Sequence, residues 1–470
     1  MGGSDLKPSR RWNRRCRYSL RSLLLVQFVM LLIVGQYYYS VRQQRIAVDE
    51  IESLGGTVYY DHAYGNARAT ESSHNASLRQ RLIERFGVDW IDSAVAVSYV
   101  DAKAPDLRPL KHLSSLREVV LFDSPVRDLS ALSNLTSLRS LSLTNTNVPH
   151  LLELRRLTNL EALDFCKTNV DDISPLQRLR RITKLEFNDT NVSDISPLRE
   201  MTNFQFLEMS KTRITSIAAL RDMADLQELD ISWTNVSDVS SLSQLYALRK
   251  LNLSGTSVAH ISALANLTRL EELDLAGTRV RDLSPLANCS ALKILNVSGT
   301  LTADISVLAK LHELTELNLA GTGVNEISAL MHTTKLEKLN LSDTRISDLD
   351  PLRGAKSLLT LDLHGTQIRS LSSITALDLL WHLDISETDI ADISELNELP
   401  SLRRVNLRHT RVVDLSPLHE LRSLYFLAIS KSQVEYNDIA ALKKAQPLCQ
   451  VTVDGSTSPK KAVPTQDAGQ

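Results

Sequence analysis

The sequence predicts an α/β solenoid in which each turn holds one short strand and one short helical segment, preceded by a single membrane-spanning helix. Three observations support this fold class. A threonine recurs every 22 residues, apolar and polar residues alternate just before each threonine, and a long apolar run lies near the amino terminus. A constant period of this length is typical of solenoids, in which each unit packs only against its neighbours.

The first element is a run of 20 mostly apolar residues over positions 22–41, which is long enough to cross a bilayer. Three consecutive tyrosines, ending at Tyr39, lie where an interfacial aromatic belt is expected. Seven lysines and arginines precede the run, whereas only two follow it before residue 46. The positive-inside rule therefore predicts a basic cytoplasmic tail over residues 1–21, a transmembrane anchor over residues 22–41 and a repeat domain outside the cytoplasm.

Two alternatives to this anchor stay open. A cleaved signal peptide would end in a small-x-small site, but no such site follows the run, which is also longer than a typical signal core. Gln27 and Gln36 lower the hydrophobicity of the run, so a buried or peripheral helix is the second alternative.

Residues 42–92 are expected to form a juxtamembrane linker followed by an amino-terminal capping helix. Leu78, Leu82, Ile83 and Phe86 fall on one face of a helix. A solenoid needs such a cap because its end turn would otherwise expose an apolar face to water.

Residues 93–454 are expected to form the solenoid itself. Before Thr278, Leu273 and Leu275 alternate with polar residues, which is the period of a strand with one buried face. The stretch Asp-Leu-Ser-Pro-Leu that starts at Asp282 recurs in other turns, some with Ile as its second residue. Serine can cap a helical turn and proline fits its first position, so a short helical or 3-10 segment is expected after each strand.

The carboxyl-terminal end is expected to close the solenoid with a helix and a last strand. Residues 442–447 predict the helix, and the alternation of Cys449, Val451 and Val453 predicts the strand. Residues 455–470 are small and polar and are predicted to be a disordered tail.

The stretch Leu270–Val280 resembles the leucine-rich repeat motif, L-x-x-L-x-L-x-x-N-x-L. The 22-residue length and the Asp-Ile-Ser-Pro-Leu continuation resemble the internalin-like class of that family, and the resemblance covers residues 94–454. It departs at one position, where threonine replaces the usual asparagine, but a threonine hydroxyl can still bond to nearby backbone. The stretch Leu54–Asp61 is similar to the linker of membrane-anchored bacterial members of the family.

This resemblance implies a curved arc, or horseshoe, with a parallel β-sheet on its concave side and short helical or 3-10 segments on its convex side. It also implies a function in binding macromolecules. Composition and spacing alone show neither the curvature nor the function.

Charge and motifs exclude several classes of function. Residues 1–45 carry a formal charge of +8 and the whole chain carries −2, so residues 46–470 carry −10, which does not favour nucleic-acid binding. No zinc-protease, nucleophile-elbow or phosphate-loop motif occurs, so no enzyme activity, cofactor or metal is predicted. His364, His382 and His409 lie on or beside the concave side and are expected to be surface residues.

The candidate binding residues are mostly acidic. Four positions before the threonine, an exposed position of the expected concave strand carries Asp, Glu or Asn in twelve successive turns, which we call the acidic column. Carboxylates about 4.8 Å apart repel one another by roughly 1 kcal/mol even in water. The column is therefore either the repeat consensus or an electronegative groove for a basic partner or for cations. Its carboxylates are Asp164, Glu186, Glu208, Asp230, Asp274, Asp362 and Asp384.

Two aromatic residues flank the first part of this column. Phe206 takes an exposed strand position, and Trp233 directly precedes a repeat threonine, where it can also pack on the next turn. Aromatic residues are over-represented among the residues that dominate binding energy, so both are candidate anchors for a partner.

The sequence therefore predicts a non-enzymatic, membrane-anchored binding protein of a bacterial envelope that recognises a protein, or less readily a glycan, on its concave face. The exposed residue six positions before the threonine differs widely between turns, which favours a specific ligand. The alternative is a structural envelope protein that self-associates or bridges membrane and wall, for which nearly identical turns would be expected.

Overall fold

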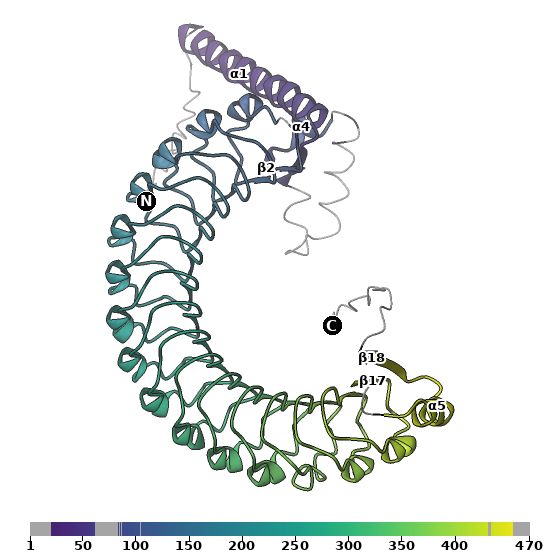
Figure 1. Ribbon diagram of the computed structural model, residues 1–470. Coiled ribbons are helices and arrows are strands. Elements are labelled where there is room, and N and C mark those ends of the chain that lie inside the picture. The colour runs from purple at the N-terminus through teal and green to yellow at the C-terminus, as the bar shows by residue number, and fades with distance from the viewer. Residues whose placement is uncertain are drawn as a thin grey trace, which may run out of the picture.

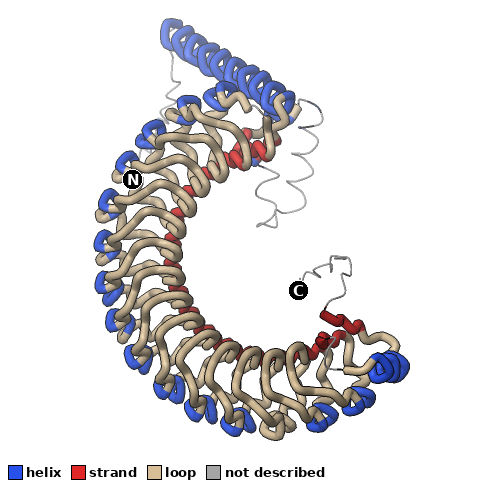
Figure 2. Tube along the Cα trace, in the orientation of Figure 1, coloured by secondary structure: helices blue, strands red, loops and turns tan. Residues whose placement is uncertain are grey.

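A computed structural model of the protein describes residues 20–61, 83, 85, 87–103, 105–430 and 434–454. These residues form one curved solenoid (Figure 1). Its strands lie on the inner side of the arc and its 3-10 helices lie on the outer side (Figure 2). The predicted arc with a concave sheet is therefore confirmed.

Within the described residues, eighteen strands form a single sheet along the inner side of the arc. Strand β1 pairs antiparallel with β2, and each strand from β2 to β17 pairs in parallel with the next one in the sequence. Residues that pair between repeats are 22 positions apart, as for Leu251, Leu273 and Leu295, so the register follows the repeat. The strands are β1 (Thr57–Tyr60), β2 (Ala94–Val100), β3 (Glu118–Phe122), β4 (Ser140–Ser142), β5 (Ala162–Asp164), β6 (Lys184–Glu186), β7 (Phe206–Glu208), β8 (Glu228–Asp230), β9 (Lys250–Asn252), β10 (Glu272–Asp274), β11 (Ile294–Asn296), β12 (Glu316–Asn318), β13 (Lys338–Asn340), β14 (Thr360–Asp362), β15 (His382–Asp384), β16 (Arg404–Asn406), β17 (Phe426–Ser430) and β18 (Gln450–Asp454).

The outer side carries a 3-10 helix in most turns. Where Asp-Ile-Ser-Pro occurs, as at Asp172, the aspartate carboxylate accepts the backbone N–H of Ser174 at 2.7 Å. The aspartate rather than the serine therefore satisfies the first free N–H, which corrects the expected capping role of the serine. The described 3-10 helices are η1 (Arg108–His112), η2 (Ser130–Leu132), η3 (Leu152–Arg156), η4 (Ser174–Leu176), η5 (Ser196–Leu198), η6 (Ala218–Leu220), η7 (Ser240–Gln244), η8 (Ser262–Leu264), η9 (Ser284–Asn288), η10 (Ser306–Lys310), η11 (Ser328–His332), η12 (Asp350–Gly354), η13 (Ser394–Glu398) and η14 (Ser416–Glu420).

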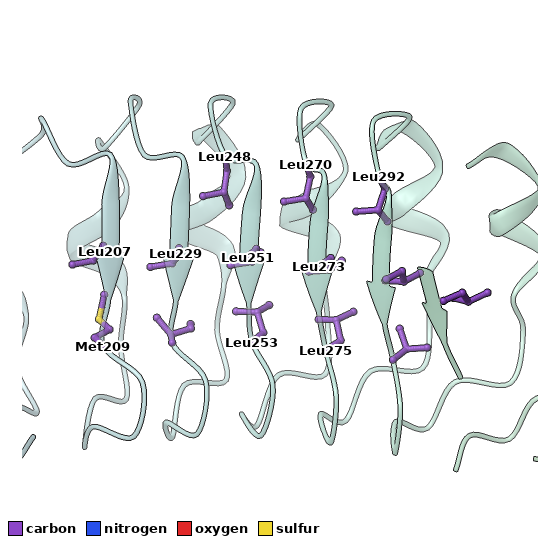
Figure 3. Close-up of a cluster of buried hydrophobic side chains, with 14 of the residues drawn as sticks. Leu207, Met209, Leu229, Leu248, Leu251, Leu253, Leu270, Leu273, Leu275 and Leu292 are labelled. Atoms are coloured by element: carbon purple, nitrogen blue, oxygen red, sulfur yellow. The ribbon is translucent and has the colours of Figure 1, made fainter. Parts of the chain in front are cut away.

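The core is a continuous file of apolar side chains between the sheet and the outer segments. Figure 3 shows Leu251 and Leu273 in register on neighbouring strands, with Leu253 and Leu275 two residues later in each turn. All four side chains are buried. Because each turn buries its leucines against both neighbours, the stacked turns stabilise one another.

The recurrent threonine is buried and fixes the turn that follows each strand. In all thirteen threonines from Thr146 to Thr410, the hydroxyl donates to the backbone carbonyl three residues earlier, at 2.5–2.9 Å. The expected local bond of this threonine to backbone is confirmed, and it stays within its own turn. Ser124 takes the same position in the first turn, where its buried hydroxyl has no partner among the described residues.

The residue before each of these positions has a left-handed backbone conformation. Its φ angle lies between 52° and 67° in the fourteen turns from Asp123 to His409, and Asp101, which precedes Ala102 one repeat earlier, has the same conformation. The N–H of this residue donates to the next turn, as from Gly277 to the carbonyl of Ser298 at 2.7 Å. Glycine adopts this conformation without strain, whereas a bulky residue does not.

Helix α1 (Leu20–Ser53) is longer than the expected span, and its last part covers the end of the solenoid. Figure 1 shows α1 lying across the first turns. Ala47 and Ile51 are buried in the core, whereas the side chains of residues 23–40 are exposed. By length and composition, α1 is the one helix in the described part of the chain that could cross a membrane.

Hydrogen bonds fix α1 to the short helix α4 (Val88–Ile91). Gln44 Nε2 donates to the Asp89 carboxylate at 3.1 Å, and the Tyr60 hydroxyl of β1 donates to the same oxygen at 2.8 Å. The ring of Trp90 lies 5.6 Å from the ring of Tyr38, measured between centroids. The segment that follows residue 41 was expected to be a linker. Its first part instead continues helix α1 and is bonded to the first turns of the solenoid.

Helix α5 (Tyr436–Ala445) and strand β18 close the other end of the arc. The helix begins before the expected segment and ends ahead of Pro447, with Leu442 buried against the last turns. Three expected segments lie outside the described residues: the basic tail up to residue 19, the capping-helix face of Leu78, Leu82 and Phe86, and the tail over residues 455–470.

Candidate binding surface

Strands β4 to β16 each leave the side chains six and four positions before the threonine at least partly exposed and bury the one between them. In β10, Glu272 and Asp274 face solvent in part, while Leu273 between them is buried. This follows from the two-residue period of a strand. The concave face therefore brings together the predicted site residues Asp164, Glu186, Phe206, Glu208, Asp230, Asp274, Asp362 and Asp384, all on strands β5 to β15.

The aspartates of the acidic column are hydrogen-bonded at the ends of their strands. The carboxylate of Asp230 accepts the N–H two residues later at 2.8 Å, and those of Asp164, Asp274, Asp362 and Asp384 do the same at 2.8–3.0 Å. The asparagines of the column make the same bond, at 2.8–3.2 Å. This is the turn-forming role of Asp and Asn, and it favours the consensus interpretation for the aspartates. That they also bind a partner stays a prediction.

Glu186 and Glu208 depart from this pattern because their side chains are one methylene longer. The backbone N–H two residues after each of them bonds instead to a side chain of the preceding turn. Asn188 N–H donates to Cys166 Sγ at 3.2 Å, and Ser210 N–H donates to Asn188 Oδ1 at 2.7 Å. Neither glutamate makes the turn bond itself. The Glu208 carboxylate accepts Asn188 Nδ2 at 2.8 Å, and the Glu186 carboxylate lies 3.1 Å from Lys184 Nζ.

Burial on this face raises the pKa of two carboxyl groups, those of Glu186 and Asp362. It raises the pKa of Glu186, although the ammonium of Lys184, 3.1 Å away, acts in the opposite direction. Burial also raises the pKa of Asp362, and the neighbouring carboxylate of Asp384 adds to this effect. Both carboxyl groups lose their proton less readily than in water, so a positively charged partner would stabilise their ionised forms.

Ion pairs neutralise the middle of the concave face. Lys250 Nζ lies 3.0 Å from the Glu272 carboxylate, and Lys338 Nζ lies 2.6 Å from that of Glu316. The first acidic turns have fewer cations, since Lys184 is the one cationic side chain on strands β5 to β8. The negative charge of the face is therefore concentrated on those four strands.

The two predicted aromatic anchors differ in position. Phe206 lies on β7, two residues before Glu208, and is half-buried among the acidic turns. Trp233 lies in the turn after β8, with φ of 57° and 65% of its surface exposed. Its indole ring packs over Gly255, where a Cβ atom would lie 2.8 Å from the ring. Trp233 is therefore at the edge of the concave face rather than on the sheet.

The concave face holds an open groove of about 660 Å³, which runs from Glu208 to His382. The groove crosses successive strands and is not closed by any lid in the described part of the chain. Its shape suits an elongated ligand rather than a small molecule enclosed on all sides.

The described residues show no arrangement typical of catalysis or metal binding. No group of three or more potential metal-ligating side chains occurs among them. Burial raises the pKa of the Cys166 thiol, and it raises that of Cys289 to about 11, so both stay protonated at neutral pH. Burial lowers the pKa of His382, and His364 Nδ1 is hydrogen-bonded to the Ser386 hydroxyl at 2.9 Å.

One group of exposed residues escaped the sequence-based prediction. Trp381, Arg403 and Tyr425 lie side by side, each directly before a strand, near the carboxyl-terminal end of the arc. A signal was present in the sequence, because the same position is polar in every turn from Arg117 to Glu337.

This geometry, an open arc with a solvent-facing parallel sheet, defines a class of proteins that offer an extended surface instead of an enclosed site. Residues 93–326 match the family model described as a leucine-rich repeat region. Residues 334–377 match the family model described as leucine rich repeats in two copies. The chain belongs to the leucine-rich repeat proteins and is of their internalin-like class, as the sequence predicted.

Several solved structures are similar to the solenoid. A crystal structure of an internalin (inlF) from Listeria monocytogenes is 26% identical, with a TM-score of 0.61, over 63% of this chain and 87% of that one. A leucine-rich repeat protein of Leptospira interrogans is 21% identical, with a TM-score of 0.69, over 74% and 92%. The plant peptide hormone receptor RGFR1 in complex with RGF2 is 18% identical, with a TM-score of 0.59, over 69% and 57%. No curated protein sequence matches the chain.

Proposed function

We propose that the protein is a non-enzymatic binding protein that is anchored in a bacterial membrane and recognises a protein partner on its concave face. The observation that carries this proposal is the variation of that face. Six positions before the threonine, successive strands present Lys184, Phe206, Glu228, Lys250, Glu272 and Ile294 on one regular scaffold. A surface that changes from turn to turn on a constant backbone favours recognition of one partner over repetitive self-contact.

The first acidic turns are the proposed contact for a basic segment of that partner. Glu186 and Glu208 are free of the turn-forming bond, and Phe206 between them offers an apolar surface. A lysine or arginine placed there would face the carboxylates of Glu186 and Glu208, and its charge would stabilise the ionised form of Glu186, whose pKa is raised by burial. A glycan fits this contact less well, because the negative charge of strands β5 to β8 favours a cationic ligand.

Residues 22–41 are the proposed membrane anchor, with residues 1–21 in the cytoplasm and the solenoid outside it. The support is the exposure of residues 23–40, which leaves a long apolar surface without cover in the described part of the chain. Apolar patches of this size are otherwise buried in lipid or in another protein. Tyr37 and Tyr38 pack near Trp90, where the anchor would leave the bilayer.

The acidic contact is tested by replacing its charges without changing its shape. In a variant with Glu186→Gln, Glu208→Gln and Asp230→Asn, the concave surface loses three negative charges while the amide of residue 230 can still accept the turn bond. We expect the full-length variant in detergent to capture at least tenfold less of its main partner from envelope extract than the unmodified protein, by quantitative mass spectrometry. Since burial raises the pKa of Glu186, binding should also weaken as the solution is acidified.

A second triple variant provides the matched control. Asp171→Asn, Glu200→Gln and Asp222→Asn make the same charge change at exposed positions away from the concave strands. This control is expected to bind like the unmodified protein. Equal capture by the concave variant would show that the acidic turns are not the contact, and concentration-dependent sedimentation of the pure protein would favour a self-associating structural role.

A further inference from the structure

An exposed aromatic and cationic surface lies at the amino-terminal edge of the last inner strands. It consists of Leu379, Trp381, Arg403, Arg404 and Tyr425, and we call it the Trp–Arg patch. These residues line an open hollow of about 750 Å³. Leu379 and Tyr425 are each 52% exposed and Trp381 is 36% exposed, so the patch presents apolar surface to solvent.

The patch breaks a pattern that the rest of the solenoid keeps. The residue directly before the inner strand is polar in eleven successive turns: Arg117, Arg139, Glu161, Thr183, Gln205, Gln227, Arg249, Glu271, Lys293, Thr315 and Glu337. In the next four turns it is Leu359, Trp381, Arg403 and Tyr425. The position is not part of the core, so packing within the solenoid does not require this change.

The backbone holds these side chains in fixed register. The N–H of Arg403 donates to the carbonyl of Trp381 at 2.9 Å, and that of Tyr425 donates to the carbonyl of Arg403 at 2.8 Å. The guanidinium of Arg404 lies 4.9 Å from the centre of the Phe426 ring. The sheet therefore fixes the spacing of these side chains, so a ligand does not have to order this backbone when it binds.

The charge of the patch indicates an acidic ligand. Elsewhere in the same column the cations have carboxylate partners, at 2.9 Å for Arg117 with Asp61, 3.3 Å for Arg139 with Glu161 and 2.7 Å for Arg249 with Glu271. Among the described residues, neither Arg403 nor Arg404 has an ion pair. Two adjacent guanidinium groups are suited to bidentate contact with carboxylates.

The shape of the site favours a thin polypeptide. Trp381, Arg403 and Tyr425 directly precede β15, β16 and β17, which are neighbours in the sheet, so the patch forms a row that an extended segment can follow. Tryptophan, tyrosine and arginine are the residue types most enriched among those that dominate protein–protein binding energy. A ligand that uses both parts of the patch needs carboxylates for the arginines and an apolar side chain for Leu379 and Trp381.

We propose that the Trp–Arg patch binds an acidic peptide segment of a protein partner, with carboxylates on Arg403 and Arg404 and an apolar side chain against Leu379 and Trp381. This proposal rests on the proposed function and adds a second contact, of opposite charge to the acidic turns. The two contacts lie at different parts of the same concave face and can be removed separately.

A displayed library of random dodecapeptides, selected on the full-length protein in detergent, tests the proposal. We expect the enriched peptides to carry net negative charge and at least one large apolar residue. Arg403→Gln with Arg404→Gln should weaken a synthetic enriched peptide at least tenfold in fluorescence anisotropy, and Trp381→Thr by about tenfold. The control Arg139→Gln removes a cation from the same column and should change nothing.

Several results would overturn the proposal. These are enrichment of only neutral or basic peptides, equal binding by the Arg403→Gln/Arg404→Gln variant, and stronger binding of polygalacturonate or the oligonucleotide dT12 than of the acidic peptide. Basic peptides that are lost with Glu186→Gln and Glu208→Gln would overturn the patch and still support the proposed function. Thermal unfolding by circular dichroism checks that each variant is folded, and threonine is already present in this column at Thr183 and Thr315.

Discussion

The left-handed position before each threonine shows how one residue per turn shapes the edge of the arc. Five turns place glycine there, at Gly255, Gly277, Gly299, Gly321 and Gly365, while others use residues for which the conformation is less favourable. Trp233 is the bulkiest of these, and its ring takes the space that Gly255 leaves open in the next turn. The exposed tryptophan and the glycine beside it are therefore coupled.

This coupling predicts unequal effects of the same substitution at two glycines. Gly277→Ala adds only the strain of a left-handed alanine, about 1 kcal/mol, because no atom lies within 3.8 Å of the added Cβ. Gly255→Ala adds the same strain and also displaces the Trp233 ring, so it should lower the free energy of unfolding by up to about 1 kcal/mol more. Urea unfolding followed by circular dichroism measures both.

A double variant provides the control for this effect. With Trp233→Gly in the background, Gly255→Ala should become as mild as Gly277→Ala, because the ring is gone. If the two alanine variants unfold at the same urea concentration in the unmodified background, the contact between Trp233 and Gly255 has no energetic weight.

At the scale of elements, helix α1 serves the solenoid as well as the proposed anchor. A solenoid end exposes the apolar side chains that would face a further turn, and Ala47, Val48 and Ile51 cover them here. The antiparallel strand β1 covers the backbone edge of β2 in the same region. Helix α1 and strand β1 together protect this end of the solenoid, which would otherwise be open to other chains.

Removing part of this cover should loosen the first turns selectively. Ile51→Ala deletes a fully buried side chain and is expected to cost about 2–4 kcal/mol. Because each turn contacts only its neighbours, hydrogen exchange should speed up in β2 and β3 and stay unchanged in β16 and β17. Ile46→Ala, at an exposed position of the same helix, is the control. Uniform acceleration along the arc would contradict a local cap.

At the scale of the whole molecule, the continuity of α1 links the proposed anchor to the solenoid. The helix passes from the exposed apolar segment to the buried cap without a break. Bonds from Gln44 and Tyr60 to Asp89 hold its second half to the first turns. If the apolar segment spans a membrane, the arc starts at the membrane surface with no flexible spacer between them.

Membrane anchoring has a direct test in the intact chain. We expect the full-length protein to stay in the membrane pellet after carbonate extraction, and a fragment that lacks residues 1–40 to be released. Protease added to intact cells with a permeable outer layer should digest the solenoid and leave the basic tail protected. A mature chain that begins after residue 41 and is found in the soluble fraction would favour the signal-peptide alternative.

Much of the fold was predictable because each turn repeats the same sequence pattern and therefore the same local structure. The period located the repeat turns, and the alternation of residues such as Leu273 and Leu275 located their parallel strands. Strand β1 was not predicted, because it lies within residues 42–92, where a linker and a capping helix were expected, and it pairs antiparallel with β2. The site was less predictable. The sequence placed Glu186 and Asp230 in one column. Only the hydrogen bonds show that the Asp230 carboxylate accepts the N–H of the turn after its strand, whereas that of Glu186 does not. The patch around Trp381 was not predicted, because its residues come from neighbouring turns and the hollow that they line exists only in the folded arc. The sequence shows one part of it, the change at the position before the strand from polar residues to Leu359, Trp381, Arg403 and Tyr425.

The sequence by itself determined the solenoid, its repeat length, its inner and outer faces and its family, because stacking of one 22-residue unit depends on contacts that recur at constant spacing. The tertiary structure decided how the chain ends and what the concave face offers. The second half of α1 becomes a cap by meeting turns that lie far from it in sequence, and Arg403 meets Trp381 and Tyr425 across neighbouring turns. Such contacts join residues of different turns, so their geometry is fixed only when the arc is formed.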